Sequence, residues 1–559
     1  MDRLSLFRSL FRGRPDLVPV RFVSKKTGKP GYAPACDNKW EPALCLLRTG
    51  GKCSDCMNQA FMPVSDQVVI DHLQGRYVMG VYPLLEDETC WFLAVDFDKS
   101  SWKEDIGAFA ETCRSVGAPV AIERSRSGDG AHAWFFFTAP ILANVARRMG
   151  CYLITETMSR RHELSMESYD RLFPNQDTMP RGGFGNLIAL PLQYEPRQQG
   201  NSVFIDERLE PLADQWGYLA SVQHIEPASA EVIAREATRT GKVVGVRFAE
   251  VIGGPEDAAP WTRPPSGRIA VTRITDPLPS AVRAVLAQRL FIEKAKLPAP
   301  LLNQLKRLAA FQNPEFYKKQ RMRLSTAMTP RVVTCAEELA HHISLPRGCV
   351  LEAEQLLREQ GATLTIKDQR CAGAALDLQF KGELTTVQKD AASALLNHDT
   401  GIFVGPPGVG KTVLGTYLVA QRACSTLVLV HRKPLLEQWV AQLAMFLDLD
   451  PKRIGRIGGG QHQLNGSLDV AMIQSLVRKE KVDDLVANYG HVIVDECHHL
   501  PAVSFERVLS EVKARHVVGL TATPQRRDGH QAITEMQLGP VRFRVDGKTK
   551  RHTGRSNTN

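Results

Sequence analysis

The chain has 559 residues, more than one hydrophobic core can serve, so we expect three or four domains of ordinary size. Its 70 Lys and Arg against 60 Asp and Glu give a net charge of +10, which suits a polyanionic partner but also fits an ordinary basic protein. No apolar run reaches the roughly 18 to 20 residues that cross a bilayer, and the basic N-terminal stretch lacks the apolar centre of a secretory signal. We therefore expect a cytoplasmic protein with no membrane partner.

Residues 1–225 are rich in aromatic side chains and strand-like runs such as CWFLAVDFD and AWFFF, which predict a mixed α/β domain. Within them, at about 30–62, lies the one cluster among twelve cysteines: Cys36, Cys45, Cys53 and Cys56. Four thiolates ending in a C-x₂-C pair suit a tetrahedral, structural Zn²⁺. Eight residues separate the first two cysteines, more than in a standard knuckle, so unliganded thiols remain the alternative.

Asp96 and Asp98 stand at the end of the strand-like run CWFLAVDFD. Because side chains two residues apart on a strand lie on one face, both carboxylates can approach the same one or two divalent ions, Mg²⁺ or Mn²⁺. Two solvated acids at a strand end are the commoner explanation when such a pair is taken alone.

About thirty residues later, ERSRSGDGAHAWFFF predicts a Gly-rich turn that leads into another strand. Hydroxyl, imidazole and backbone N–H groups on such a turn can bind a triphosphate, and arginines nearby add positive charge. The residues of this predicted site are Arg124, Arg126, Ser127, Gly128, Gly130 and His132.

An acidic pair at a strand end followed by Ser-Gly-x-Gly-x-His resembles the archaeo-eukaryotic primase superfamily, and the similarity extends through residues 168–193. It is closest to the primase-like domains fused to helicases in bacterial TOTE conflict systems. The resemblance implies that Asp96 and Asp98 bind the catalytic metals, which activate a primer 3′-hydroxyl and stabilise the leaving pyrophosphate. It also implies that Ser127 and His132 bind the incoming NTP or dNTP.

The family also implies a third catalytic acid, for which Asp170 in SYDRLFP is our choice and Asp177 the alternative. Arg181 precedes the Gly-rich GGFGN stretch, and Asn186 is its last residue. They are candidate phosphate or template contacts, although a tight structural turn explains them equally well.

The middle of the chain divides into two stretches. Residues 226–280 are rich in Ala, Gly, Pro and charge and predict a linker, whereas 281–380 show helical periodicity and predict a mixed, mainly helical domain. Within the latter, FQNPEFYKKQRMRLST places cations beside Phe316 and Tyr317, so it either binds a phosphate backbone and stacks a base or forms a solvated helix face. The cations are Lys318, Lys319, Arg321 and Arg323.

After residue 381, short apolar strands alternate with helices, which predicts a parallel α/β domain over 381–545, followed by a polar tail over 546–559. The run GIFVGPPGVGKT has the strand, Gly-rich loop and following helix of a phosphate-binding loop for ATP. Its backbone N–H groups and Lys411 would bind phosphates, and Thr412 would offer a hydroxyl to Mg²⁺. The loop comprises Gly405, Pro406, Pro407, Gly408, Val409, Gly410, Lys411 and Thr412.

About ninety residues further on, HVIVDECHHL ends a strand with Asp495 and Glu496. Phosphoryl transfer needs a metal, an in-line water and neutralised charge, so we expect Asp495 to hold Mg²⁺ and Glu496 to orient or deprotonate the water. His498 and His499 are adjacent and would diverge, so we reject a zinc site there.

These motifs, together with residues 427–439, 471–476 and 519–529, resemble superfamily-two helicases of the DEAD/DEAH-like branch that includes XPB and UvsW. The resemblance implies that Gln388 reads the adenine of ATP, and that the segments containing Arg432, Lys433 and the IGGG run contact the nucleic-acid backbone. Coupling of hydrolysis to DNA is implied for Thr521, Ala522 and Thr523.

Motors of this branch have a second RecA-like lobe, but only about thirty residues follow Gly529. We therefore expect another chain to supply that lobe, or the motor to be truncated. The sequence as a whole predicts a primase-polymerase coupled to a helicase or translocase. It would act on single-stranded or duplex DNA, or RNA, in genome defence in a bacterium, phage or mobile element. The alternatives are a translocase whose primase-like domain only binds or modifies nucleotides, and a scaffold subunit.

Overall fold

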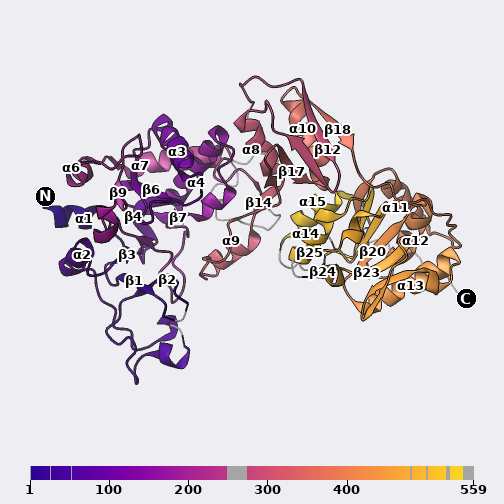
Figure 1. Cartoon of the computed structure of the whole chain (residues 1–559), viewed down its shortest axis with the longest axis horizontal. Coiled ribbons are helices and arrows are strands. Elements are labelled where there is room, and N and C mark those ends of the chain that lie inside the picture. Colours follow the sequence, from indigo (N-terminus) through magenta and orange to yellow (C-terminus); the bar gives the residue numbers. More distant parts are fainter. Residues whose placement is uncertain are drawn as a thin grey trace, which may run out of the picture. The chain divides into compact units, whose positions relative to one another are not determined.

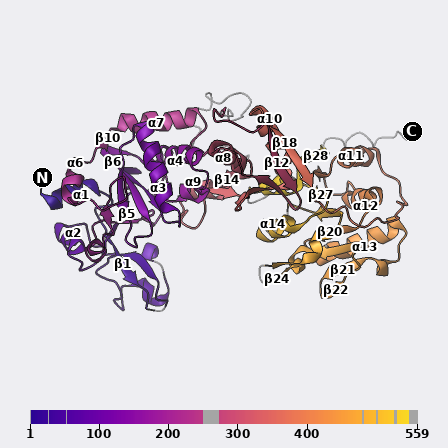
Figure 2. The same cartoon turned by 45° about the horizontal axis from the view of Figure 1, so that its top comes forward.

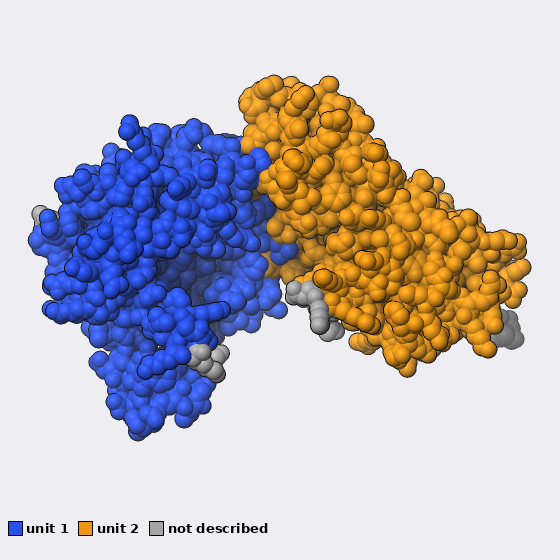
Figure 3. All heavy atoms as spheres, in the orientation of Figure 1, with its two compact units in different colours: residues 1–245, 252–272, 315–333 blue, residues 246–251, 273–314, 334–559 orange. Residues whose placement is uncertain are grey.

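A computed structural model describes residues 2–25, 27–51, 53–248, 273–478, 481–498, 502–523 and 529–545. The chain forms two compact units (Figure 3), one built from residues 1–245 and 315–333 and the other mainly from 273–314 and from 334 onward. Among the helices in these ranges, none combines the length and apolar character of a membrane-crossing segment.

Unit 1 is centred on an antiparallel sheet in the order β7-β4-β6-β5-β9, with β10 pairing parallel to β6 (Figure 1). One face of the sheet carries α3 (Trp102–Val116) and α4 (Ala143–Arg160), where Phe109 packs on Phe97 and Phe135. The opposite face carries Phe92 and Trp134 and packs against α1 (Arg3–Leu10). The strands are β4 (Thr89–Phe97), β5 (Ala121–Arg124), β6 (Ala131–Leu142), β7 (Leu172–Phe173), β9 (Val203–Phe204) and β10 (His224–Ile225).

A smaller part of unit 1 precedes this sheet. It consists of the antiparallel hairpin of β1 (Pro19–Val23) and β2 (Pro30–Pro34), the loop that carries the four clustered cysteines, and α2 (Asp66–Leu73). The hairpin and the loop, drawn in indigo in Figure 1, project from the body of the unit. β3 (Gly80–Val81) pairs with β8 (Ile188–Ala189) beside them.

The expected linker over 226–280 is wrong in its first part. Residues Pro227–Arg239 form helix α7, whose buried Ala230, Ala234 and Ala237 give it a narrow apolar stripe that packs against α4. Small side chains allow this close approach of two helices. The Ala-rich composition that suggested a linker therefore reflects the packing of α7 against α4. The Gly- and Pro-rich remainder lies largely outside the described residues.

A segment from the middle of the chain, residues 315–333, belongs to unit 1 and is called the strap below. It begins in α9 (Pro314–Arg321) and buries Phe316, Tyr317 and Gln320. Because both aromatic rings are buried, the expected stacking of a base on them is wrong. Of the four expected nucleic-acid cations, Lys319 pairs with Glu315 and Arg323 with Glu88.

Unit 2 begins with a five-stranded sheet in the order β16-β17-β13-β12-β18. The prediction of a mainly helical domain over 281–380 is therefore wrong. The run read as helical, VRAVLAQRLFIE, forms an antiparallel hairpin whose first strand alternates exposed and buried side chains. Helices do form where the other periodic segments predicted them, at α8 (Ala299–Leu308) and α10 (Val350–Glu359). The strands are β12 (Ala281–Leu286), β13 (Arg289–Glu293), β16 (Glu337–Glu338), β17 (His342–Pro346) and β18 (Thr363–Asp368).

The rest of unit 2 is a sheet in the order β22-β21-β23-β20-β26-β27-β19-β28, parallel except for the edge strand β22. One face is covered by α11 (Thr386–Leu396), α12 (Lys411–Arg422) and α13 (Lys433–Leu447), and the other by α14 (Ala502–Glu511) and α15 (Gln531–Leu538). Figure 1 labels all five helices, and Figure 2 shows α14 and α13 on opposite sides of the sheet. The expected parallel α/β domain is confirmed. Its strands are β19 (Thr400–Val404), β20 (Thr426–Val430), β21 (Gly455–Gly458), β22 (Gln461–Gln463), β23 (Leu468–Met472), β26 (His491–Asp495), β27 (His516–Thr521) and β28 (Val541–Arg544).

Candidate active sites

Three strands of unit 1 bring Asp96, His132 and Glu123 into one row across the sheet. Asp96 on β4 pairs directly with His132 on β6, and His132 pairs directly with Glu123 on β5. Directly paired residues project from the same face, so the three side chains meet there. By the same alternation this is the face that carries Phe92 and Trp134, opposite to α3 and α4.

His132 is held between the two acids. Its Nδ1 lies 2.9 Å from Oε2 of Glu123, and its Nε2 lies 3.7 Å from Oδ1 of Asp96. Burial lowers the pKa of His132, but the charge and hydrogen bond of Glu123 and the charges of Asp96 and Asp98 together outweigh it and raise that pKa. Neighbouring carboxylates favour the protonated form of an imidazole, which is the form suited to binding phosphate oxygens.

The carboxylates of Asp96 and Asp98 converge on a single cationic nitrogen. Nη1 of Arg171 lies 3.2 Å from Oδ2 of Asp96 and 2.5 Å from Oδ2 of Asp98. The two chain segments are also joined by a main-chain hydrogen bond from Asp96 N to the Arg171 carbonyl, 3.0 Å long. Carboxylate oxygens are ligands that Mg²⁺ prefers. In this structure both carboxylates are paired with the guanidinium of Arg171.

The Gly-rich turn packs directly against this acidic pair. Its backbone is closed by hydrogen bonds from Ser125 N to the Gly130 carbonyl, 2.8 Å, and from Gly128 N to the Ser125 carbonyl, 3.1 Å. A Cβ on Gly130 would lie 2.6 Å from the carbonyl oxygen of Phe97, so only glycine lets the turn approach the end of β4. The hydroxyl of Ser127 accepts the N–H of Asp129 within this turn.

In unit 2, three adjacent strands end at one edge of the parallel sheet and each leads into a predicted motif. The phosphate-binding loop follows β19, Asp495 ends β26 and Thr521 ends β27, and the register pairs Val404 with Thr521 and Asp495 with Leu520. In open α/β sheets, ligands bind outside the carboxyl ends of the strands. The loop opens helix α12 at Gly410, which has a φ of 80° and leaves the helix N-terminus without a side-chain cap. Both features suit a phosphate group.

The acidic pair of this second site is held by a hydrogen bond and an ion pair. Oδ2 of Asp495 accepts a 2.8 Å hydrogen bond from the indole N–H of buried Trp439. Burial raises the pKa of Asp495, the charge of Glu496 adds to this, and the Trp439 hydrogen bond opposes it. Oε1 of Glu496 lies 3.3 Å from Nζ of Lys411, and Glu496 has a φ of 47°, a strained backbone for a non-glycine residue.

Comparisons with known proteins agree with this geometry. Residues 2–233 match the family model described as TOTE conflict system, Archaeo-Eukaryotic Primase domain, and residues 381–526 match Type III restriction enzyme, res subunit. DNA 3'-5' translocase XPB2 of Sulfurisphaera tokodaii is 33% identical over 167 residues, which cover 30% of this chain and 37% of the relative. The chain joins a TOTE-type primase domain to a superfamily-two helicase domain.

A further sequence relative and a solved structure also have similarity to this chain. Probable helicase D10 of Escherichia phage T5 is 34% identical over 135 residues, which cover 24% of this chain and 29% of the relative. The UvsW helicase from Bacteriophage T4 is 15% identical, with a TM-score of 0.37, over 47% of this chain and 100% of that structure. The chain thus spans 37% and 29% of the length of the two sequence relatives.

In the primase domain, the two acids proposed as third metal ligand are engaged elsewhere. Both oxygens of Asp177 bind the guanidinium of buried Arg147, and the charge of Arg147 helps to lower the pKa of Asp177 against the effect of burial, which raises it. Asp170 accepts the main-chain N–H of Arg331 at 2.8 Å. The sequence reasoning missed Glu123, although its charge within a strand-like run just before the Gly-rich turn could have marked it.

Other expected phosphate contacts have structural partners. The guanidinium of Arg124 donates to the carbonyls of Gly200 and Leu209, so its predicted role on a triphosphate is not supported. Asn186 donates to the Leu172 carbonyl and accepts the N–H of Asn175, which favours the tight-turn explanation for this residue.

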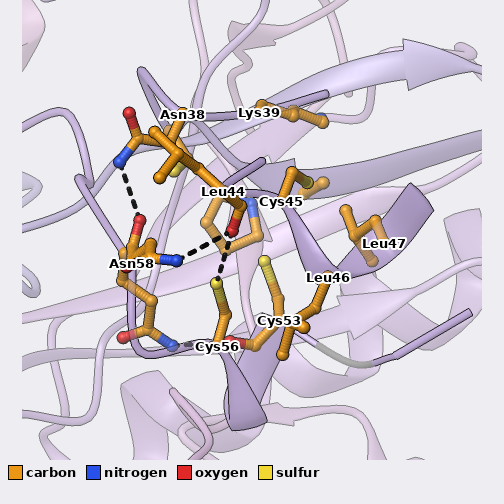
Figure 4. A pocket seen from close by; sticks show the side chains of 13 residues that line it. Asn38, Lys39, Leu44, Cys45, Leu46, Leu47, Cys53, Cys56 and Asn58 are labelled. Carbon is orange, nitrogen blue, oxygen red and sulfur yellow. Dashed lines mark hydrogen bonds between the residues drawn. The ribbon is translucent and has the colours of Figure 1, made fainter. Parts of the chain in front are cut away.

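The four clustered cysteines line one pocket of the primase domain, and all four are free thiols (Figure 4). The N–H of Cys56 donates to the Cys53 carbonyl at 3.2 Å, and burial together with the charges of Cys36, Cys45 and Cys56 raises the pKa of the Cys53 thiol. Across the described ranges, however, no three His, Cys, Asp or Glu side chains are arranged so that they could hold a metal ion. The thiols are gathered, and the expected zinc stays a prediction.

In the helicase domain, the remaining predicted residues lie near the two motifs. Gln388 is buried, and its amide nitrogen donates to the carbonyls of Val409 and Gly410 in the phosphate-binding loop. The Thr521 hydroxyl is 2.7 Å from Nδ1 of His498 and 2.7 Å from the Thr523 carbonyl, so it links the end of β27 to the segment after Asp495.

The two segments expected to contact the nucleic-acid backbone lie together. Arg432 and Lys433 are exposed at the start of α13. A Cβ on Gly459 of the IGGG run would lie 2.9 Å from Cδ of Lys433, so the two segments are in contact.

Proposed function

We propose that the chain is a primase-polymerase coupled to a DNA helicase or translocase, acting in genome defence. One observation carries the nucleotidyl-transfer half of the proposal. Asp96 and Asp98 converge on the guanidinium of Arg171 beside His132, and the Gly130 turn packs against the same strand end. This arrangement supports the proposal of a two-carboxylate metal site beside groups suited to a triphosphate.

Mg²⁺ or Mn²⁺ bound by Asp96 and Asp98 would activate the 3′-hydroxyl and neutralise the leaving pyrophosphate. His132, fixed by Glu123, would hold the triphosphate by its positive charge, and the Ser127 turn would offer its hydroxyl and N–H groups. The bond between the 3′-oxygen and the α-phosphorus forms as the bond to pyrophosphate breaks.

The helicase domain is proposed to bind and hydrolyse ATP with Mg²⁺ on the loop 405–412 and Asp495, with Glu496 directing the water. Gln388 would contact the adenine after releasing the loop carbonyls that it binds here. We propose that Zn²⁺ bound to the four clustered cysteines stabilises the loop that carries them.

The test is template-dependent incorporation of labelled NTP and dNTP, assayed separately with single-stranded and primed templates. We expect incorporation by the full chain and its loss in Asp96→Asn/Asp98→Asn, with ATP binding unchanged in that variant. Absence of incorporation with every template and metal would overturn the proposal.

A second function is a translocase whose primase domain binds nucleotides without polymerising them. It is favoured by the absence, within the described residues, of a third acid beside Asp96 and Asp98 that is free to bind a metal. Saturable NTP binding without incorporation would support it.

A further inference from the structure

The β1–β2 hairpin and the cysteine loop expose two aromatic side chains. Phe22 is 44% and Trp40 58% exposed, whereas the large aromatic rings of the neighbouring core, such as Phe7, Phe92 and Trp134, are no more than 1% exposed. A single exposed aromatic residue needs no explanation, but here two occur in one projecting part of the unit. They are linked through Lys39, which stands over the Phe22 ring and precedes Trp40 in the chain.

Specific contacts hold the ring of Phe22 and the main chain of Trp40. The ring of Phe22 lies across Gly31 of the partner strand, where an added Cβ would come within 3.0 Å of Cζ. Nζ of Lys39 stands 5.7 Å from the centroid of the same ring. Trp40 follows with a φ of 70°, a conformation that bulky residues rarely adopt, and its carbonyl accepts a 2.9 Å hydrogen bond from Arg48. The hydrogen bond from Arg48 therefore holds the strained main chain of Trp40, while the indole ring is exposed to solvent.

This surface is also basic. Residues 17–62 contain seven Lys and Arg against three Asp and Glu. Lys25 and Lys29 are exposed in the turn of the hairpin, which is closed by a 2.9 Å hydrogen bond from Ser24 N to the Lys29 carbonyl. An excess of positive charge around aromatic rings is complementary to a strand that offers phosphates and unstacked bases.

The two faces of the hairpin differ in exposure. Register pairs Phe22 with Gly31 and Arg21 with Tyr32, so Phe22 and Tyr32 lie on opposite faces of the hairpin. Burial raises the pKa of Tyr32, whereas Phe22 is 44% exposed. One face of the hairpin is therefore covered, and the other carries Phe22 into solvent.

We propose that single-stranded nucleic acid binds on this aromatic–lysine face, formed by Phe22, Lys25, Lys29, Lys39, Trp40 and Arg48. Bases stack on the two rings, and the cations contact the phosphates. Its use as the template grip of a polymerase depends on the proposed function, whereas the binding itself does not.

Binding is tested on the full chain by fluorescence anisotropy with a labelled, mixed-sequence single strand. We expect Trp40→Ala and Phe22→Ala each to weaken binding about 5- to 100-fold, the range for one lost base–aromatic stack. The triple variant Lys25→Gln/Lys29→Gln/Arg48→Gln should reduce the slope of log K against log salt by roughly 2, about 0.7 for each lost phosphate contact. Tyr194→Ala is the matched control, because this exposed ring also has an arginine over it and lies outside the face.

Because the helicase domain can bind the same strand, photocross-linking with 5-iodouracil oligonucleotides locates the contact. We expect cross-linked peptides that contain Phe22 or Trp40, and their loss with unlabelled competitor strand. Trp40→Phe should restore affinity, and unchanged melting temperatures would exclude misfolding.

Cross-links confined to other segments would overturn the proposal, as would unchanged affinity in both ring variants or an equal loss in Tyr194→Ala. A change of oligomeric state with no change in strand affinity would identify a contact between copies instead, and would also overturn it. Asp96→Asn/Asp98→Asn should keep strand binding while losing incorporation, so a failure of the polymerase hypothesis is distinguishable from a failure of this one.

Discussion

Arg171 is expected to compete with a divalent cation for Asp96 and Asp98, so replacing it should tighten metal binding. Arg171→Met removes the positive charge and keeps most of the apolar stem. The lost contacts are two ion pairs of 3.2 and 2.5 Å among side chains that are 18–45% exposed. Partly exposed pairs are each worth about 0.2–1 kcal/mol, so together we expect roughly 0.4–2 kcal/mol. This corresponds to a dissociation constant for Mn²⁺ that is about 2- to 30-fold lower.

Calorimetric titration of the full chain with Mn²⁺, without nucleotide, measures this effect. Asp96→Asn should abolish the tightened binding, which assigns it to this site. Arg114→Met serves as the control, because Arg114 forms one exposed ion pair with Glu207 in the same unit. If Mn²⁺ affinity is unchanged or weaker in Arg171→Met, then Arg171 does not occupy the position of the metal and the reasoning fails.

Three further predictions concern the two units. Trp439→Phe keeps an aromatic ring but removes the hydrogen bond to Asp495. Because a hydrogen bond to a charged group is worth about 1.5–3 kcal/mol, Mg²⁺-dependent ATP binding should weaken about 10- to 100-fold. ATP binding measured without Mg²⁺ should stay unchanged. Arg147→Met leaves Asp177 as an unpaired buried charge and should destabilise unit 1 by about 3–5 kcal/mol in urea unfolding; the double variant Arg147→Met/Asp177→Leu should recover most of the loss. Burial lowers the pKa of His72 to about 4, so between pH 6.5 and 4 the unfolded state is protonated at this residue and the folded state is not. The free energy of unfolding should therefore fall by ~3 kcal/mol as pH drops from about 6.5 to 4. His72→Gln should flatten that slope, and a slope equal to wild type would contradict the assignment.

Local patterns in the sequence were enough to locate the two candidate sites. The phosphate-binding loop needs only a strand, glycines, Lys411 and a helix in succession, and all are adjacent in the chain. Asp96 and Asp98 were visible for the same reason. What the sequence could not supply was register. Glu123 enters the site only because β5 pairs with β6, and Arg171 only because β7 brings a segment 73 residues away to the end of β4.

Errors arose where tertiary contacts decide the outcome. The run VRAVLAQRLFIE has apolar residues that fit both a helix and two short strands, and pairing with β17 and β18 selects the strands. Phe316 and Tyr317 sit among cations as a nucleic-acid contact would, yet Phe316 packs under the guanidinium of Arg331 in unit 1. Periodicity and charge describe a segment alone, and burial depends on what the rest of the chain places beside it.

The strap has a consequence for how this chain can be divided. Gln320 accepts the N–H of Asp177 and donates to its carboxylate, and Arg331 binds Asp170 and the Asn175 carbonyl. A fragment cut after residue 245 would therefore lose the groups that hold residues 170–177, the segment that contains Arg171. The primase half is discontinuous in sequence. Exchange of domains between relatives would have to transfer residues 315–333 along with the N-terminal portion, or leave both halves incomplete.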